Sequence, residues 1–269
     1  MRYEGWSIYE ESQIQMIAAA ADILSRLFGH LAPHVVPGIP TIELDEMAEA
    51  FIRKEGAEPA FKGYQPPFED QVYPFTLCIS INEEIVHGLP SPQRRLAAGQ
   101  IVTIDCGVRL EGFHADMAYT FPVGEVSPQA MKLLQVTHEA LLRGIQKARA
   151  GGYMGDIGYA ISEYAKSYNF AVSEQLTGHG IGEAMHMPPD VPNVGKPGKG
   201  ARLPENLVIA IEPMIQIGSR KVRRGADGWS VQTQDGSLSA HFEHTVVVRR
   251  KGAQVLTTFE HIKKAFAHV

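Results

Sequence analysis

The stretch IDCGVRLEGFHADMAYTF, from Ile104 to Phe121, is typical of two β-strands joined by a turn. Apolar and β-branched residues fill the runs on either side of LEGF, whose glycine favours the turn. Each run nevertheless carries a carboxylate, Asp105 in the first and Asp116 in the second. An ionised carboxylate is costly to bury without a cationic partner. The two aspartates therefore indicate a functional site within the predicted sheet.

Three further side chains lie in comparable surroundings. Glu212 occurs in VIAIEPMI, Glu243 in HFEHTVVV and His179 in the glycine-rich TGHGIG. Alone, each would more often be a solvent-facing strand carboxylate or a loop histidine, but five such motifs contain only one Lys or Arg, Arg109. A metal can supply the missing charge, and oxygen-rich ligation with one nitrogen suits Mn²⁺, Fe²⁺, Co²⁺ or Zn²⁺. Two ions bridged by shared carboxylates would use all four acids.

The apolar spacing along the rest of the chain predicts amphipathic helices that alternate with blocks of strands. Thr41 is expected to cap the second helix, and Ser127 the third, with Pro128 at the first helical position. The helices are predicted over residues 7–31, 43–55, 128–149 and 156–167. The strands are predicted over residues 77–82, 100–108, 113–121, 206–217 and 241–249.

The order of two helices followed by strands occurs twice, which predicts an internal repeat. At an offset of 113 positions, the apolar residues of the second and fourth predicted helices coincide. We expect one catalytic domain, residues 1–269, made of two halves at about 10–123 and 127–250. Its class would be α+β, a pseudo-two-fold symmetric antiparallel sheet covered by helices on one face.

Composition excludes several classes of protein. Apolar residues make up 44% of the chain and charged residues 20%, which is ordinary for a globular protein. The net charge of −5 argues against nucleic acid or an anionic membrane as the main partner. Cys78 and Cys106, both in apolar runs, provide no disulfide framework. With no apolar segment of signal-peptide or membrane-spanning type, we expect a cytoplasmic protein.

Five motifs, in chain order, resemble those of type I methionine aminopeptidases of the pita-bread metallopeptidase family: SINEEIVHGLP, IDCGVRLEGFHADMAYTF, TGHGIG, IEPM and DGWSVQTQDGSLSAHFEHTVVV. The resemblance covers about residues 13–256 and implies the pita-bread fold. It also implies a dinuclear metal centre in which Asp116 and Glu243 bridge two divalent ions. The implied ligands are Asp105, Asp116, His179, Glu212 and Glu243. Co, Mn, Fe and Zn remain open as the metal.

The implied activity is removal of the N-terminal methionine from nascent polypeptides, with preference for a small second residue. Glu212 would accept the proton of the attacking water in addition to its role as ligand. By the same resemblance, His87 would contact the scissile amide nitrogen, and His186 would hydrogen-bond the substrate or the oxyanion. His114, two residues before Asp116, is expected beside the ligands and not among them.

The methionine pocket should be apolar, and the resemblance implies that Tyr64, Cys78 and Trp229 line it, together with Tyr73. Two departures affect its expected shape. Met185 replaces the phenylalanine found in many relatives, and the loop over residues 65–75 is longer than usual.

Two other functions are compatible with the fold that the resemblance implies. A prolidase or aminopeptidase-P-like enzyme would normally have an additional N-terminal domain and differ around FEHT. A non-catalytic pita-bread binding module would have lost metal ligands. The expected partners are peptide and nascent-chain N-termini, with transient ribosome contact, and without a nucleic-acid function, a membrane or a second subunit.

Overall fold

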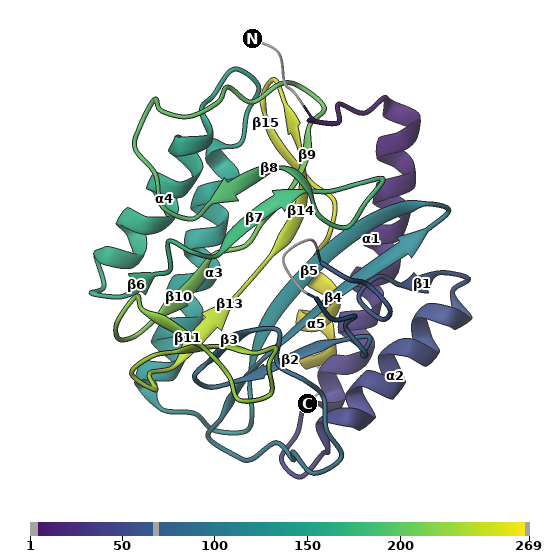
Figure 1. Cartoon of the computed structure of the whole chain (residues 1–269), viewed down its shortest axis with the longest axis vertical. Coiled ribbons are helices and arrows are strands. Elements are labelled where there is room, and N and C mark those ends of the chain that lie inside the picture. Colours follow the sequence, from purple (N-terminus) through teal and green to yellow (C-terminus); the bar gives the residue numbers. More distant parts are fainter. Residues whose placement is uncertain (1–4, 67–69, 267–269) are drawn as a thin grey trace.

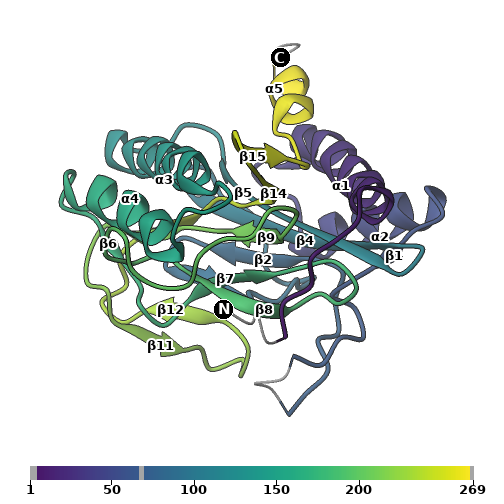
Figure 2. The same cartoon turned by 90° about the horizontal axis from the view of Figure 1, so that it is seen from above.

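A computed structural model describes residues 5–66 and 70–266 (Figures 1 and 2). Two helix pairs, α1 (Glu11–Leu31) with α2 (Thr41–Lys54) and α3 (Pro128–Lys147) with α4 (Met154–Lys166), pack as neighbours. Figure 2 shows α1 and α3 over the same face of the strands, with α2 and α4 towards the outer edges. The short 3₁₀ helix η1 (Ala32–His34) follows α1. This arrangement confirms the α+β class.

Local hydrogen bonds place the first two helix starts differently from the sequence prediction. The backbone N–H of Glu10 donates to Oε1 of Gln13 at 3.0 Å, so α1 begins at Glu11 and not at residue 7. The expected cap by Thr41 is wrong, because Thr41 is the first residue of α2. Its hydroxyl instead bonds the backbone of Ser91, which lies 50 positions away.

The second helix pair follows the prediction more closely. Oγ of Ser127 accepts the N–H of Ala130 at 3.1 Å, and Pro128 is the first residue of α3, as expected. Helix α4 begins at Met154, two residues earlier than predicted. The Asp156 carboxylate accepts the Tyr153 N–H at 3.1 Å and fixes that start.

The first predicted strand block forms a sheet around a long hairpin. Strands β4 (Ile101–Leu110) and β5 (Phe113–Pro122) pair along their whole length, with β2 (Cys78–Ile81) and β1 (Glu58–Pro59) on the other edge of β4. In this register Asp105 faces Ala118 and Asp116 faces Gly107. Since residues two apart on a strand share a face, both aspartates point to the same side of the sheet.

Two strands that the sequence predicts as continuous are divided. The segment 206–217 forms β9 (Val208–Ile211) and β10 (Met214–Gln216), and the segment 241–249 supplies the end of β13 (Ser239–His241) and all of β14 (His244–Arg249). Pro213 has no N–H to donate, so the ladder cannot continue through the first break. Strand β9 pairs with β14, whereas β10 pairs with β13.

Within residues 5–66 and 70–266, the hydrogen-bonded strands therefore form four sheets instead of one uninterrupted sheet, and the strands within each sheet pair antiparallel. Their orders are β1-β4-β2 with β5 on β4, β13-β10-β6, β11-β12-β3, and β15-β14-β9-β7-β8. The remaining strands are β3 (Glu84–Val86), β6 (Ala171–Val172), β7 (Thr177–Gly180), β8 (Met187–Pro192), β11 (Val222–Arg224), β12 (Val231–Thr233) and β15 (Gly252–Val255). The C-terminal helix α5 (Glu260–Phe266) packs on α1.

No helix within residues 5–66 and 70–266 is both long enough and apolar enough to span a bilayer.

Candidate metal centre

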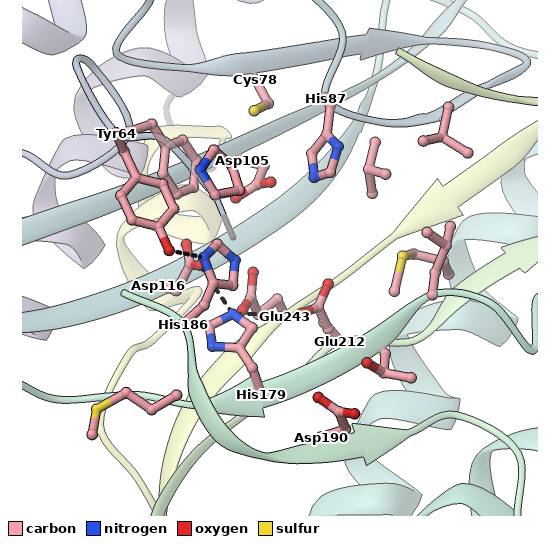
Figure 3. A pocket seen from close by; sticks show the side chains of 18 of the residues that line it. Tyr64, Cys78, His87, Asp105, Asp116, His179, His186, Asp190, Glu212 and Glu243 are labelled. Atoms are coloured by element: carbon pink, nitrogen blue, oxygen red, sulfur yellow. Dashed lines mark hydrogen bonds and ion pairs between the residues drawn. The ribbon is translucent and has the colours of Figure 1, made fainter. Parts of the chain in front are cut away.

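One cavity of about 820 Å³ brings the five expected ligands together (Figure 3). They come from different elements: Asp105 from β4, Asp116 from β5, His179 from β7, Glu212 from the break after β9, and Glu243 from the break before β14. The strand breaks are thus the points at which two carboxylates enter the cavity. No Lys or Arg lies among the described residues that line it.

The imidazole of His179 is oriented for metal binding. Its Nδ1 lies 3.0 Å from the carbonyl oxygen of Gly180, to which an Nδ1–H can donate. This tautomer directs the Nε2 lone pair at the acids, 3.6 Å from Oδ2 of Asp116 and 3.7 Å from Oε1 of Glu212. Burial lowers the pKa of His179, but these two carboxylates outweigh it and the net pKa is raised.

Asp105, Asp116 and Glu243 lie in surroundings that disfavour their ionised forms. Burial, followed by repulsion from Asp116 and Glu212, raises the pKa values of Asp105 and Glu243 well above their usual range. Burial also raises the pKa of Asp116. Oδ1 of Asp105 and Oε1 of Glu243 are buried and have no hydrogen-bond partner in the part of the chain that the structure describes. Bound divalent cations would provide the missing partners, so the donor set fits a metal centre.

Among the described residues, two groups of three side chains have potential ligand atoms within 4.8 Å of one another. The first consists of Asp116, His179 and Glu243, and the second of Glu212, His241 and Glu243. Glu243 belongs to both groups, as a bridging ligand would. Asp105 lines the same cavity without belonging to either group.

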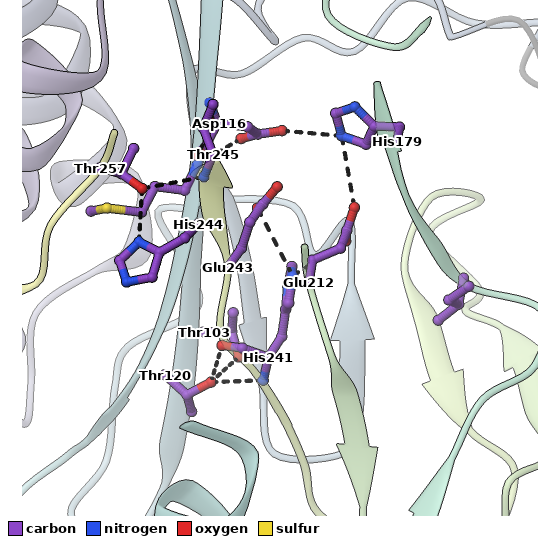
Figure 4. Close-up of polar contacts among 12 residues, drawn as sticks. Thr103, Asp116, Thr120, His179, Glu212, His241, Glu243, His244, Thr245 and Thr257 are labelled. Atoms are coloured by element: carbon purple, nitrogen blue, oxygen red, sulfur yellow. Dashed lines mark hydrogen bonds and ion pairs between the residues drawn. The ribbon is translucent and has the colours of Figure 1, made fainter. Parts of the chain in front are cut away.

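Sequence reasoning missed His241, which ends β13 and has a side chain only 1% exposed. Its Nε2 lies 3.3 Å from Oε2 of Glu212 and 4.0 Å from Oε2 of Glu243 (Figure 4). The available signal was its position two residues before Glu243 in HFEH.

Sequence reasoning also missed Thr245 of β14, whose side chain forms hydrogen bonds with the backbone of β5 (Figure 4). Its hydroxyl accepts the N–H of Asp116 at 2.9 Å and donates to the Asp116 carbonyl at 2.8 Å. The N–H of Glu243 donates to the carbonyl of Ala118 at 2.9 Å. These bonds hold the backbones of Asp116 and Glu243 side by side, although the two residues are far apart in the sequence.

The two histidines expected to contact substrate also line the cavity. Nδ1 of His186 lies 3.0 Å from the hydroxyl of Tyr64, and the two rings stack with centroids 5.3 Å apart. Burial lowers the pKa of His186 to about 2, assisted by nearby His179 and His87, so this imidazole is neutral at pH 7. His87 adopts a left-handed backbone conformation, with φ of 60°.

The apolar part of the cavity contains Tyr64, Cys78, Tyr73 and Trp229, the four residues that the resemblance implied. The rings of Tyr73 and Trp229 meet edge to face with centroids 5.0 Å apart. Both cysteines are buried free thiols, as expected.

Met185 and the long loop 65–75, the two features that differ from the resembling family, affect this pocket differently. Met185 is buried and does not line the cavity; its sulfur packs close to Gly107 of β4. In the long loop 65–75, Pro66 and Tyr73 line the cavity, whereas residues 67–69 lie outside the described residues. His114 is not a lining residue, and its Nδ1 lies 2.9 Å from the carbonyl of Gly182.

Comparisons with known proteins relate the chain to a family of metallopeptidases. Residues 15–250 match metallopeptidase family M24. The chain is 45% identical to the methionine aminopeptidase of Aquifex aeolicus, over 93% of this chain and 98% of that protein. It is 43% identical to methionine aminopeptidase 1 of Bacillus subtilis, over 91% of this chain and 96% of that protein.

Solved structures give the same result. The crystal structure of methionine aminopeptidase from Thermotoga maritima has a TM-score of 0.90 at 35% identity, covering 94% of this chain and 99% of that one. The prolidase from Pyrococcus furiosus has a TM-score of 0.71 at 21% identity, covering 93% of this chain and 65% of that one, and shows the fold alone. The expected pita-bread fold is thereby confirmed, and the chain belongs to metallopeptidase family M24.

Proposed function

We propose that this chain is a metal-dependent aminopeptidase that removes the N-terminal methionine from polypeptides with a small second residue. The observation that carries the proposal is the cavity in which four of the lining carboxylates, those of Asp105, Asp116, Glu212 and Glu243, lie with His179 beside an apolar pocket. Relatives named methionine aminopeptidase match nearly the whole chain at 40–45% identity. Prolidase-like neighbours are 19–23% identical and support only the shared fold. A non-catalytic binding module is disfavoured because the full donor set is retained.

The proposed centre holds two divalent ions through Asp105, Asp116, His179, Glu212 and Glu243. Its support is the two buried carboxylate oxygens, on Asp105 and Glu243, that have no hydrogen-bond partner among the described residues. The place of Glu243 in both three-residue groups adds to this support. Bound divalent ions supply Lewis-acid activation of water and of the scissile carbonyl at such a centre. Mn, Fe, Co and Zn all accept this donor set, so availability decides among them.

The protein's own residues have separate proposed roles. Glu212 accepts the proton of the attacking water, because its carboxylate lines the cavity with Oε1 3.7 Å from Nε2 of His179. A hydroxyl proton donated by Tyr64 to Nδ1 of His186 places the imidazole proton on Nε2. In this state His186 can donate to the substrate carbonyl or the oxyanion. His87 contacts the scissile amide nitrogen.

Tyr64, Cys78 and Trp229 are proposed to receive the methionine side chain. A flexible, apolar thioether suits a pocket of aromatic rings and a buried thiol. Burial raises the pKa of the Cys78 thiol well above its usual range, so this residue presents a neutral surface.

The proposal of a single catalytic domain is supported by a shared core. One cluster of buried apolar residues extends from Ala20 in α1 to Ile262 in α5 and includes both proposed halves. Action on nascent chains during protein maturation, transient ribosome contact, a monomeric state and a cytoplasmic location stay predictions.

The direct test is release of methionine from the peptide Met-Ala-Ser by metal-free protein, before and after addition of Mn²⁺ or Co²⁺. We expect release that depends on added metal and stops with a chelator. No release with Mn²⁺, Fe²⁺, Co²⁺ or Zn²⁺, together with cleavage of an Xaa-Pro peptide, would replace the proposed activity by that of a prolidase-like enzyme.

A further inference from the structure

The imidazole of His241 lies behind the metal centre and not in its cavity. The cavity is lined by Glu212 and Glu243 but not by His241. Nε2 of His241 nevertheless approaches Oε2 of Glu212 to 3.3 Å. Neither ring nitrogen has a hydrogen-bond partner with good geometry among the described residues. A buried imidazole without partners is unfavourable, so these carboxylates are the groups that can satisfy it.

The backbone of His241 is held tightly from the opposite side. Its N–H donates to Oγ1 of Thr120 at 2.9 Å, and its carbonyl accepts from the same hydroxyl at 2.8 Å. Oγ1 of Thr103 lies 2.8 Å from Oγ1 of Thr120 and completes the network (Figure 4). His241 also pairs with Met214, two residues after Glu212. These contacts fix the backbone of His241, from which the imidazole projects, relative to the Glu212 carboxylate.

The two oxygens of Glu212 face different histidines. Oε1 lies 3.7 Å from Nε2 of His179, on the cavity side, and Oε2 lies 3.3 Å from Nε2 of His241. We propose that His241 is a positioning residue, which donates its Nε2–H to Oε2 and thereby keeps Oε1 directed at the metal centre. This inference rests on the proposed function, because it takes Glu212 as a metal ligand and proton acceptor.

A direct metal bond from His241 is less consistent with its position. Glu212 and Glu243 lie between the imidazole and the cavity, and the distance to Oε2 of Glu243 is 4.0 Å. Hydrogen bonds that orient ligating side chains commonly come from such residues just outside the ligand set. A metal bond from His241 is therefore an outcome that the test must distinguish.

The test compares His241→Leu, which removes the donor, with His241→Gln, which keeps a donor N–H at a similar reach. Mn²⁺ binding to each metal-free protein is measured by isothermal titration calorimetry. We expect His241→Leu to weaken binding of an ion by about 10- to 100-fold, the usual loss when such a partner is removed. His241→Gln should recover most of this loss. Thermal unfolding of each variant verifies that it folds.

The matched control is His138→Gln on α3, a histidine that packs against Phe242 and Phe259 and is not among the described residues that line the cavity. It should bind Mn²⁺ as the unchanged protein does. Glu212→Ala serves as the positive control. If Glu212→Ala also binds Mn²⁺ normally, the proposed metal centre fails, independently of the role of His241.

A second readout separates positioning from ligation. X-ray absorption of the Co²⁺-loaded protein counts imidazole ligands, and His241→Gln should leave that count unchanged. Loss of an imidazole in His241→Gln would show that His241 is a ligand and would overturn the positioning role. Unchanged Mn²⁺ affinity in a folded His241→Leu variant, with weakened binding in Glu212→Ala, would also overturn it.

Discussion

Replacing Asp45 with Asn should stabilise the protein at alkaline pH, although Asp45 lies outside the metal centre. Asp45, on α2, is 3% exposed, and its Oδ1 accepts the N–H groups of Thr76 at 2.9 Å and Leu77 at 2.7 Å. It thereby holds the segment that leads into Cys78. Burial raises its pKa from 3.8 to about 6, despite these two bonds. The folded protein therefore favours the neutral form of the Asp45 side chain more than the unfolded chain does.

The size of the effect follows from that difference in pKa. A change from 3.8 to about 6 corresponds to about 3 kcal/mol, at roughly 1.4 kcal/mol for each tenfold change in the dissociation constant. Because the pKa is higher in the folded state, this contribution is fully present below pH 3.8 and is lost as the pH rises through about 6. The carbonyl of Asn can accept the same two N–H groups without carrying a charge.

The assay is urea denaturation of the metal-free protein at pH 8 and again near pH 4. We expect Asp45→Asn to raise the free energy of unfolding by up to about 3 kcal/mol at pH 8 and by little near pH 4. Glu46→Gln, which changes an exposed carboxylate on the same helix, is the matched control and should have little effect. Loss of stability at pH 8, or an equal gain at both pH values, would refute the reasoning.

Three further predictions concern the proposed centre and its substrate. Asp116→Ala or Glu243→Ala should abolish turnover and weaken metal binding, measured as kcat and as bound metal per chain; near-normal activity at saturating metal would contradict a shared ligand. Because the carboxylates raise the pKa of His179 above 6.5, protons should begin to compete with the metal for this imidazole above that pH. The competition should increase as the pH falls. Calorimetric affinity that stays flat from about pH 5 to 8 would exclude His179 as a ligand. Met-Ala peptides should be cleaved much faster than Met-Leu or Met-Arg peptides at equal concentration, and equal rates would show that the site does not restrict the second residue.

The five residues expected as ligands share one cavity, and they could be selected from the sequence because each has a local signal. Asp105 and Asp116 interrupt apolar strand runs, and the glycine of LEGF predicts the turn that brings their strands together. Pro213, directly after Glu212, is a sequence signal for the break in that strand.

The remaining parts of the centre depend on contacts between distant segments. His241 reaches Glu212 because β13 pairs with β10, and Thr245 supports Asp116 across 129 positions. Likewise, the hydroxyl of Thr41 bonds the backbone of Ser91 instead of capping α2. A local pattern contains no information about these pairings, since each is determined by how whole strands and loops pack.

The separation between Asp116 and Glu243 has a consequence for biosynthesis. Asp116 is synthesised 127 residues before Glu243, so the face of the β4–β5 hairpin that carries Asp105 and Asp116 is uncovered until β14 has been translated. An apolar strand pair in that state would be prone to join the edge of another chain. Negative charges on such strands oppose this association. The aspartates proposed as metal ligands would thus also protect the unfinished polypeptide against aggregation until Thr245 of β14 bonds to this hairpin.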